Sequence, residues 1–278
     1  MYSNERNSLL CPNCRKLISA DEPSCPYCGL ARPGSRKILG KLSHLSGDIT
    51  KIIIYINAGF YILSVLIGFS RLNLSANPFT FLAPSQEGLF VLGATGTIPI
   101  AGFGRWWTLV SASFLHGGLM HIFFNMLALT QLGAFVHQEF GFYRFVILYT
   151  LTGIAGFFLS FLAGVPFTIG ASASICGLIG AILYYGKTRG GFYGEAIYRQ
   201  ALGWVVGLVI FGLLVPGINN WAHGGGLVAG IIVTWFLGYQ ERRQEITLHK
   251  ILALICIVLT AAVLCWAIIQ AAYLYLLS

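Results

Sequence analysis

Long apolar runs alternate with short polar segments over most of the chain after residue 50. Seven such runs lie at about 52–70, 113–136, 143–164, 170–186, 201–216, 221–239 and 251–276. A helix needs roughly 20 apolar residues to cross the hydrocarbon core of a bilayer. Each run therefore predicts a transmembrane helix, although several are short or rich in glycine. Together they predict an all-α polytopic membrane protein.

The segment between the first two runs, residues 71–108, has a different pattern. It is interrupted by Pro78, Pro84 and Pro99 and is too polar to cross a bilayer. Trp106 and Trp107 stand near its end, and tryptophan is enriched where membranes meet water. We expect a structured loop at the membrane interface.

Composition agrees with a membrane protein and argues against a soluble domain. The chain is 56% hydrophobic and only 9% charged, with a mean hydropathy of +0.77, whereas soluble domains carry far more charge. The net charge of +8 does not indicate a nucleic-acid-binding protein, because most Lys and Arg residues lie in short segments between the apolar runs.

The positions of these charges predict an orientation. With the N-terminus inside, 15 of the 17 Lys and Arg residues fall on the inner side, and only Arg71 and Arg105 fall on the outer side. Positive residues favour the cytoplasmic side, so we expect a cytoplasmic N-terminus and an outer C-terminus. Residues 1–50 contain no apolar leader-like run, and insertion is expected to begin at the first helix.

Four cysteines near the N-terminus form two CxxC pairs, Cys11 with Cys14 and Cys25 with Cys28. Each pair directs two thiolates at one point, and two pairs complete a tetrahedral zinc site with no open position. Disulfides are one alternative, disfavoured at a cytosolic terminus. A redox-active pair is the other, but no βαβ pattern surrounds these cysteines. We predict a structural zinc site in a ribbon over 1–32.

Polar side chains recur at one depth in three of the predicted helices. Under the predicted topology, the runs starting at 113, 170 and 221 all begin at the outer face. Their outer ends carry His116, His121 and Asn125 in the first run, Ser172 in the second and His223 in the third. A polar residue inside a membrane must find a partner or water, so such residues are candidates for function. Taken singly, Ser172 and His223 are equally compatible with helix packing.

Small residues would let these helices approach closely. Gly226 and Gly230 share one helix face, and Gly177 and Gly180 leave the facing helix without side chains at two positions. Such backbone contact would bring the short Ser172 side chain within reach of an imidazole on the neighbouring helix. For the glycines alone, ordinary helix association is a sufficient explanation.

None of the acidic residues falls at the level of Ser172 and His223. A Ser-His-Asp triad and a carboxylate-ligated metal centre are therefore excluded, and catalysis at this level would use a Ser-His pair. Two rival nucleophiles are Ser174, which faces another side of a helix, and Cys176, one turn deeper where apolar surroundings disfavour a thiolate. The acidic residues are Glu5, Asp21, Glu22, Asp48, Glu87, Glu139, Glu195, Glu241 and Glu245.

Three motifs together resemble those of the rhomboid family of intramembrane serine proteases, in the family's order and over roughly residues 50–240. The resemblance implies a six-helix protease core over 51–240 and a seventh transmembrane helix after a cytoplasmic loop, over 241–278. The zinc ribbon and a basic linker over 33–50 would precede them. The motifs are Gly170-Ala171-Ser172-Ala173, Ala222-His223-Gly224-Gly225-Gly226 with Gly230, and His121-x-x-x-Asn125 after His116-Gly117-Gly118.

Carried over to the matching residues, the resemblance implies Ser172 as the nucleophile and His223 as its general base and then acid. It implies that His121, Asn125 and the Ser172 backbone N–H stabilise the oxyanion, and that Gly170 lets a substrate backbone approach. The implied reaction is hydrolysis of a peptide bond in or next to a transmembrane segment of a membrane protein, within the bilayer and at a site open to the outer face. No cofactor is expected for catalysis and no nucleic acid as a partner; the ribbon is a candidate site for a protein partner.

Three positions depart from the family pattern. Ala173 replaces a glycine after the serine, Cys176 replaces an aromatic residue that commonly packs on the histidine, and Thr108 follows Trp107 where arginine is common. The first change adds only a methyl group. The other two bear on the packing of His223 and on the anchoring of the interfacial loop.

Two functions of other classes compete with a protease. A catalytically silent rhomboid-like protein that binds transmembrane clients would typically lack the serine or the histidine, and both are present here. A transporter or channel would place charged residues deep in several helices, a pattern that this sequence does not have.

Overall fold

The computed structural model describes residues 8–11, 14, 16–19, 22–30, 49–67 and 81–277, with side chains to residue 274. It divides into two compact units, Met1–Ile49 and Thr50–Ser278. Most of the predicted basic linker lies outside the described residues, as do Arg71 and Pro78 of the predicted interfacial loop.

The first unit is built around a small hairpin and its cysteines. Strands β1 (Ser8–Leu10) and β2 (Leu17–Ser19) pair antiparallel, with Leu9 opposite Ile18. Ile18 is buried together with Cys11 and Cys25. This core is too small to stabilise a domain by burial alone, which is why small folds of this kind use a metal or disulfides.

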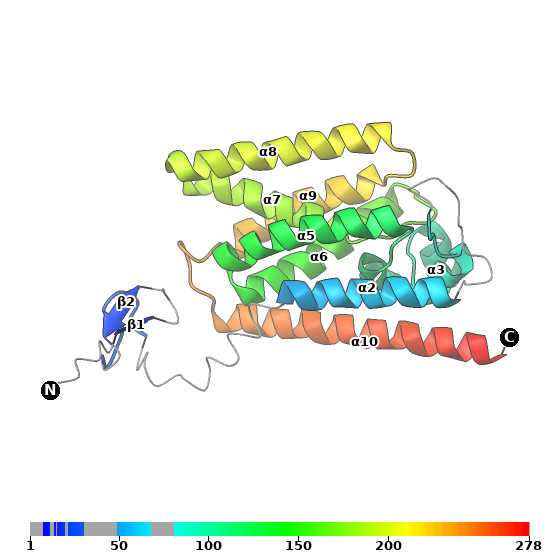
Figure 1. Ribbon diagram of the computed structural model, residues 1–278, viewed down its shortest axis with the longest axis horizontal. Helices are drawn as coiled ribbons and strands as arrows, with labels where there is room; N and C mark the ends of the chain where they lie inside the picture. Colours follow the sequence, from blue (N-terminus) through cyan, green and yellow to red (C-terminus); the bar gives the residue numbers. More distant parts are fainter. Residues whose placement is uncertain are drawn as a thin grey trace. The chain divides into compact units, whose positions relative to one another are not determined.

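The second unit is a bundle of long helices (Figure 1). Helices α6, α7 and α9 pack together at its centre, and α8 packs chiefly against α7. Helix α10 runs against α6, against α3 (Gln86–Leu92) of the predicted interfacial loop, and against α4 (Thr108–Ser111), which begins where that loop was predicted to end. The long helices are α2 (Ile49–Ile67), α5 (Leu119–Phe140), α6 (Phe142–Leu162), α7 (Ser172–Arg189), α8 (Gly191–Leu214), α9 (Asn220–Leu237) and α10 (Thr247–Leu277).

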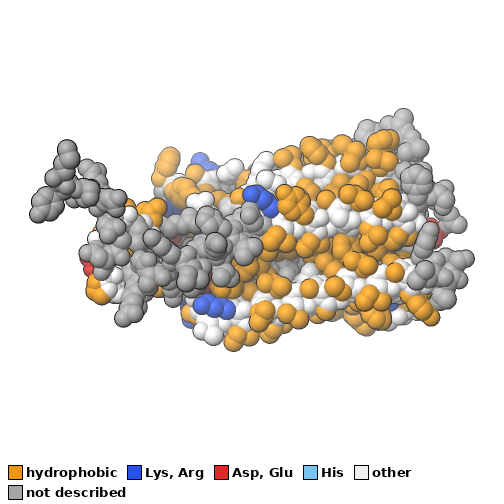
Figure 2. All heavy atoms as spheres, turned by 60° about the horizontal axis from the view of Figure 1, so that its bottom comes forward, with side chains coloured by type: hydrophobic (Ala, Val, Ile, Leu, Met, Phe, Trp, Pro, Cys, Tyr) orange, Lys and Arg blue, Asp and Glu red, His pale blue; other side chains and the backbone are white. Residues whose placement is uncertain are grey.

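Among the described residues, five helices are long and apolar enough to cross a membrane: α2, α5, α6, α8 and the stretch Thr247–Leu274 of α10. Apolar side chains extend along the helices on the face seen in Figure 2, and Lys and Arg side chains gather toward the end at which α10 begins. Five of the seven predicted spans are thus candidate spans. The other two coincide with α7 and α9, which are short and hold Ser172, His223 and many glycines, so their crossing of the membrane stays a prediction.

Two predicted helix boundaries are wrong. The run 113–136 does not begin as a helix at residue 113, because Ala112–Phe114 forms a short 3₁₀ turn and α5 starts only at Leu119. The run 201–216 is the second part of α8, which already starts at Gly191. The turn between α7 and α8 is tight because Gly190 and Gly191 both adopt positive φ, at 68° and 66°.

Glycines bring α7 and α9 into backbone contact, as the sequence predicted. A Cβ atom added to Gly226 would clash with the carbonyl oxygen of Ala173, and one added to Gly230 would clash with that of Gly177. On the facing helix, a Cβ added to Gly180 would meet a carbonyl oxygen of α9. Small residues at such positions are what allow membrane helices to pack this closely.

Arg105 anchors the loop that precedes α5. Its guanidinium donates to the carbonyl oxygens of Phe90 and Val91, at 2.6 and 3.0 Å, and thereby satisfies carbonyls at the C-terminal end of α3. It also donates to Gln270 Oε1 on α10 and lies over the rings of Phe90 and Trp107. Arg105 therefore anchors this loop even though position 108, where the family pattern has arginine, holds threonine.

A buried arginine ties the adjoining ends of α5, α6 and α9 to the turn that leads into α10. Arg144 on α6 is fully buried and donates to the carbonyl oxygens of Phe140 and Leu237, near the ends of α5 and α9. Glu245 Oε1 accepts from the backbone N–H groups of Tyr143 and Arg144, at 2.9 and 3.0 Å. A carboxylate there complements the positive N-terminal end of α6.

Candidate functional site

The centre of the site is a contact between a serine and a histidine on two neighbouring helices. Ser172 is the first residue of α7, and His223 lies in the first turn of α9. The distance between Ser172 Oγ and His223 Nε2 is 2.9 Å, a hydrogen-bond distance. When His223 Nε2 accepts the serine proton, His223 Nδ1 carries the other ring hydrogen.

Asn219 fixes the start of α9 and with it the position of His223. Its Oδ1 accepts from the backbone N–H of Ala222 and caps the helix. Its Nδ2 donates to Ser160 Oγ on α6, at 2.6 Å, and to Thr168 Oγ1, at 2.9 Å. The first turn of α9 is therefore held to α6 and to the segment that leads into α7.

The segment before α7 holds Ser172 in place at the start of that helix. Thr168 pairs with Thr95 in an isolated β-bridge, and the backbone N–H of Gly170 donates to the carbonyl oxygen of Ala112, at 2.8 Å. Gly170 has φ of +126°, a conformation that side-chain-bearing residues rarely adopt. The backbone conformation at position 170, two residues before Ser172, therefore requires a glycine.

His121 of α5 lies near Ser172, and Asn125 follows one turn later on the same helix. The backbone N–H of Gly117 donates to His121 Nδ1, at 3.3 Å, which leaves the ring hydrogen on His121 Nε2. A Cβ atom at Gly170 would lie 2.8 Å from His121 Nε2 and 3.6 Å from Ser172 Oγ, so the Nε2–H reaches the region of the serine. Asn125 Nδ2 donates to the carbonyl oxygen of His121, at 2.9 Å, and keeps a second N–H.

His116 was expected within the same helix as His121 and Asn125, and this prediction is wrong. It lies in the segment before α5, which starts at Leu119, and its side chain is fully buried. Its ring packs edge-on against that of His121, with centroids 5.0 Å apart. Neither ring nitrogen of His116 has a hydrogen-bond partner in the described part of the chain. Its observed contact is thus with the ring of His121.

The two rival nucleophiles are buried, and they face different neighbours. Ser174 is fully buried, and a Cβ atom added to Gly153 of α6 would clash with Ser174 Oγ, so its hydroxyl faces α6. Cys176 is 1% exposed and lines an apolar cavity that also touches His223. The sequence argument that Ser174 faces away from the side of Ser172 agrees with these contacts.

His223 Nδ1 is buried and has no hydrogen-bond partner among the described residues. Among the described residues, no carboxylate bonds to this nitrogen as one does in a Ser-His-Asp triad. The orientation of the imidazole therefore rests on the capped start of α9, on the contact with Ser172 and on packing.

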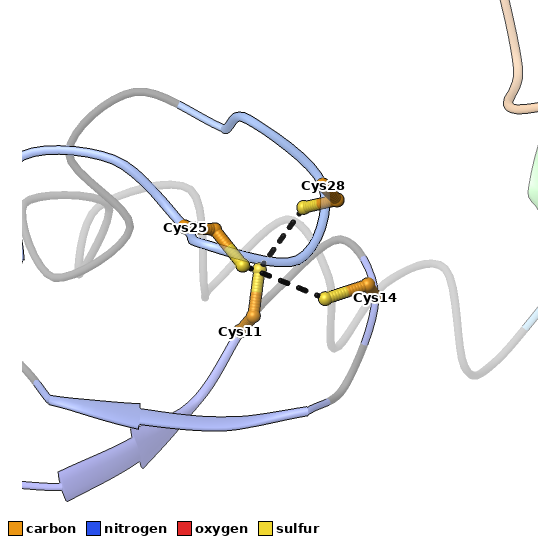
Figure 3. Close-up of side chains that lie close together, drawn as sticks. All are labelled: Cys11, Cys14, Cys25 and Cys28. Carbon is orange, nitrogen blue, oxygen red and sulfur yellow. Dashed lines mark hydrogen bonds between the residues drawn. The ribbon is translucent and has the colours of Figure 1, made fainter.

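The four N-terminal cysteines form a separate cluster (Figure 3), in which all four thiol groups point toward one another. Their sulfur atoms lie within 4.8 Å of one another, with Cys11 3.7 Å from Cys28 and Cys14 3.6 Å from Cys25. Four thiolates at 2.3 Å from one tetrahedral metal ion would be about 3.8 Å apart. The donor set and its spacing thus fit a bound metal ion.

Comparison with known proteins indicates the family of the second unit. A model of the rhomboid domain matches residues 103–240, which include Ser172, His223, His121 and Asn125. The chain belongs to the rhomboid family. It is a multi-pass integral membrane protein with a four-cysteine cluster near its N-terminus that is consistent with a zinc ribbon.

Named relatives differ in their activity. The chain is 34% identical to RHOMBOID-like protein 4 of Arabidopsis thaliana, over 61% of this chain and 43% of that protein. It is 34% identical to Rhomboid protease GluP of Bacillus subtilis, over 56% of this chain and 31% of that protein. The chain is 31% identical to Inactive RHOMBOID-like protein 8 of Arabidopsis thaliana, over 66% of this chain and 52% of that protein. These alignments span less than two thirds of each relative, and the family includes proteases as well as an inactive member.

Proposed function

We propose that this protein is an intramembrane serine endopeptidase that hydrolyses peptide bonds in or next to transmembrane segments of membrane proteins. The observation that carries the proposal is the 2.9 Å contact between Ser172 Oγ and His223 Nε2. A serine hydroxyl becomes a nucleophile when an adjacent base can take its proton.

The reaction follows from the positions of these groups. Ser172 Oγ attacks the carbonyl carbon of the scissile bond while His223 Nε2 takes the hydroxyl proton. The negative charge that forms on the carbonyl oxygen is stabilised by His121 Nε2–H, the free N–H of Asn125 and the backbone N–H of Ser172 at the start of α7. His223 then donates its proton to the leaving nitrogen, and a water molecule hydrolyses the acyl-enzyme with the same histidine as base.

The similarity to Rhomboid protease GluP supports this assignment. The similarity to Inactive RHOMBOID-like protein 8 supports a second candidate function, in which the chain binds transmembrane clients without cleaving them. The presence of both Ser172 and His223 at hydrogen-bond distance favours the protease.

We further propose a seven-span topology in which α7 and α9 cross the membrane with the other five long helices. The distribution of Lys and Arg supports a cytoplasmic N-terminus and a site that opens toward the outer face. The proposed domains are a ribbon over 1–32, a basic linker over 33–50, the protease core over 51–240 and the last loop and helix over 241–278.

In the first unit, Cys11, Cys14, Cys25 and Cys28 would hold one zinc ion. Four thiolates fill all four positions of a tetrahedral ion and leave none for water or substrate, so the zinc would stabilise the ribbon. The metal has no part in the proposed proteolysis, and the ribbon is a candidate docking site for a protein partner.

A cleavage assay with purified protein in liposomes tests the protease assignment. The substrates would be a panel of single transmembrane segments with helix-destabilising residues. Wild type and Ser174→Ala are expected to cleave members of this panel, and Ser172→Ala and His223→Ala are expected to cleave none. Binding of these segments by wild type without any cleavage would support the silent alternative and overturn the proposal.

A further inference from the structure

A cavity of about 260 Å³ lies between α7, α8 and α9, directly beside His223. Cys176 and Leu227 line it from α7 and α9, and Leu208, Val209 and Leu213 line it from α8. An apolar cavity of about 150 Å³ already accommodates benzene. This cavity therefore has room for several carbon atoms next to the imidazole.

The cavity exists because α8 approaches its neighbours only near its two ends. The buried residues of α8 are Gly194, Ile197, Ala201 and Gly212. At the first end, Gly194 meets the backbone of Gly186 on α7. At the other, Asn220 Nδ2 donates to the carbonyl oxygen of Gly212, at 2.9 Å. Between Ala201 and Gly212 the helix stands away from α7 and α9, and the cavity occupies this space.

The mouth of the cavity is continuous with the lipid-facing surface of the protein. Val209 and Leu213, which line it, are 54% and 78% exposed. On α9, Val228 and Ile232 add further exposed apolar side chains. For a multi-pass membrane protein, this surface lies against the acyl chains of the bilayer.

The groups proposed to bind substrate do not reach this space. Ser172, Gly170, His121 and Asn125 are not among its lining residues. Water finds few partners in this space, because an ordered water molecule needs two to four polar partners and the lining is mainly aliphatic, with Asn220 and His223 as its polar residues. An aliphatic chain loses no hydrogen bonds on entry and gains contacts with walls that otherwise face a void.

We propose that an acyl chain of a bilayer lipid occupies this cavity and packs against His223. The short Cys176 side chain leaves the space that the lipid fills, and the lipid in turn helps to hold the imidazole in place. The binding site stands on the cavity and its mouth alone, so it does not depend on the chain being a protease.

Photo-crosslinking in nanodiscs tests this proposal. The probe is a phosphatidylcholine that carries a diazirine within its acyl chain, and adducts are located by peptide mass spectrometry after irradiation. Cys176 is 1% exposed and would be modified only by a chain that enters the cavity. Cys256 on α10, which is 5% exposed and is not a lining residue, is the matched buried thiol and should remain unmodified.

Two variants narrow the cavity from opposite walls. Cys176→Phe should lower adduct formation at Leu208, and Leu208→Trp should lower it at Cys176, while labelling of the exposed Leu254 on α10 stays the same. Val209 at the mouth serves to show that the probe reaches the protein there. If Val209 is labelled but Cys176 is modified no more than Cys256, the proposal is overturned. Loss of the Cys176 adduct on addition of a transmembrane substrate peptide would also overturn it, because the cavity would then belong to the substrate.

Discussion

Two hydrogen bonds bear on where the ring hydrogens of His121 and His223 lie. The Gly117 N–H places the His121 hydrogen on Nε2, and the proposed role of His223 as a base requires its Nε2 to accept the hydrogen of the Ser172 hydroxyl. In the proposed mechanism, the two imidazoles therefore act differently at the same serine. One is placed to accept the proton and the other to donate a hydrogen bond to the developing oxyanion.

His121→Ala tests the second role. Removal of one preorganised oxyanion donor typically lowers kcat by about 10²–10³-fold, and we expect a loss of this size with little change in KM. Steady-state cleavage of a fluorogenic transmembrane substrate would measure both constants. A raised KM with unchanged kcat would instead place His121 in substrate binding.

At the residue scale, the sequence favoured Ser172 over Ser174 as the nucleophile, because residues two apart on a helix face different sides, and this choice stays a prediction. It misplaced His116, since the start of α5 depends on a 3₁₀ turn and on Gly117 and Gly118, which no hydropathy window detects. The cavity beside Cys176 was also beyond the sequence. Its existence depends on how far α8 stands from α9, which is a tertiary property.

At the scale of elements, backbone contact between α7 and α9 brings the two side chains together. Ser172 has a short side chain and reaches an imidazole on another helix only if the helices nearly touch. Gly226 and Gly230 provide this approach, each against a carbonyl oxygen of α7.

Gly226→Ala should separate the helices and destabilise the fold. The new methyl group would clash with the carbonyl oxygen of Ala173, and such overpacking costs about 1–3 kcal/mol. The Tm should fall by about 2–4 °C for each kcal/mol, and cleavage should fall with it. Thermal unfolding in detergent measures the change, and Gly207→Ala on α8 is the control, since its methyl group would meet nothing within 4 Å. Equal Tm values for the two variants would contradict this account of the helix contact.

Hydropathy predicted the number of long helices but not all their limits or their membrane crossing. Helices α7 and α9 contain Ser172, His223 and several glycines, and these residues lower the hydropathy of the two helices. The first turns of α8 contain Glu195 and Arg199, which form an ion pair at 2.8 Å. Because these residues are charged, the apolar run read from the sequence began only after them. In both cases the sequence signal is weakest where polar residues have a local role.

At the scale of the whole molecule, the chain joins a membrane domain to a small cysteine-containing unit. The CxxC spacing was sufficient to predict the cluster of Cys11, Cys14, Cys25 and Cys28, because each pair positions two sulfur atoms locally and the hairpin brings the pairs together. Family motifs were sufficient to predict the rhomboid domain. The arrangement of the two units and the task of the ribbon do not follow from either pattern.

Metal analysis tests the proposed zinc site. Wild type should contain about one zinc ion per chain, as expected for a four-cysteine site. Cys11→Ser should lose most of this zinc, because three thiolates no longer complete the tetrahedron, whereas Cys265→Ser on α10 should keep it. Unchanged zinc content in Cys11→Ser would exclude the four-cysteine assignment.

The most direct test of the central claim is labelling by a fluorophosphonate probe, with the modified residue located by mass spectrometry. Purified wild type and Ser174→Ala should each be labelled on Ser172, and Ser172→Ala should not be labelled. His223→Ala should lose labelling as well, because the hydroxyl would lack its base. No labelling of wild type under conditions in which the protein is folded, or labelling on Ser174, would contradict the assignment of Ser172 as an activated nucleophile.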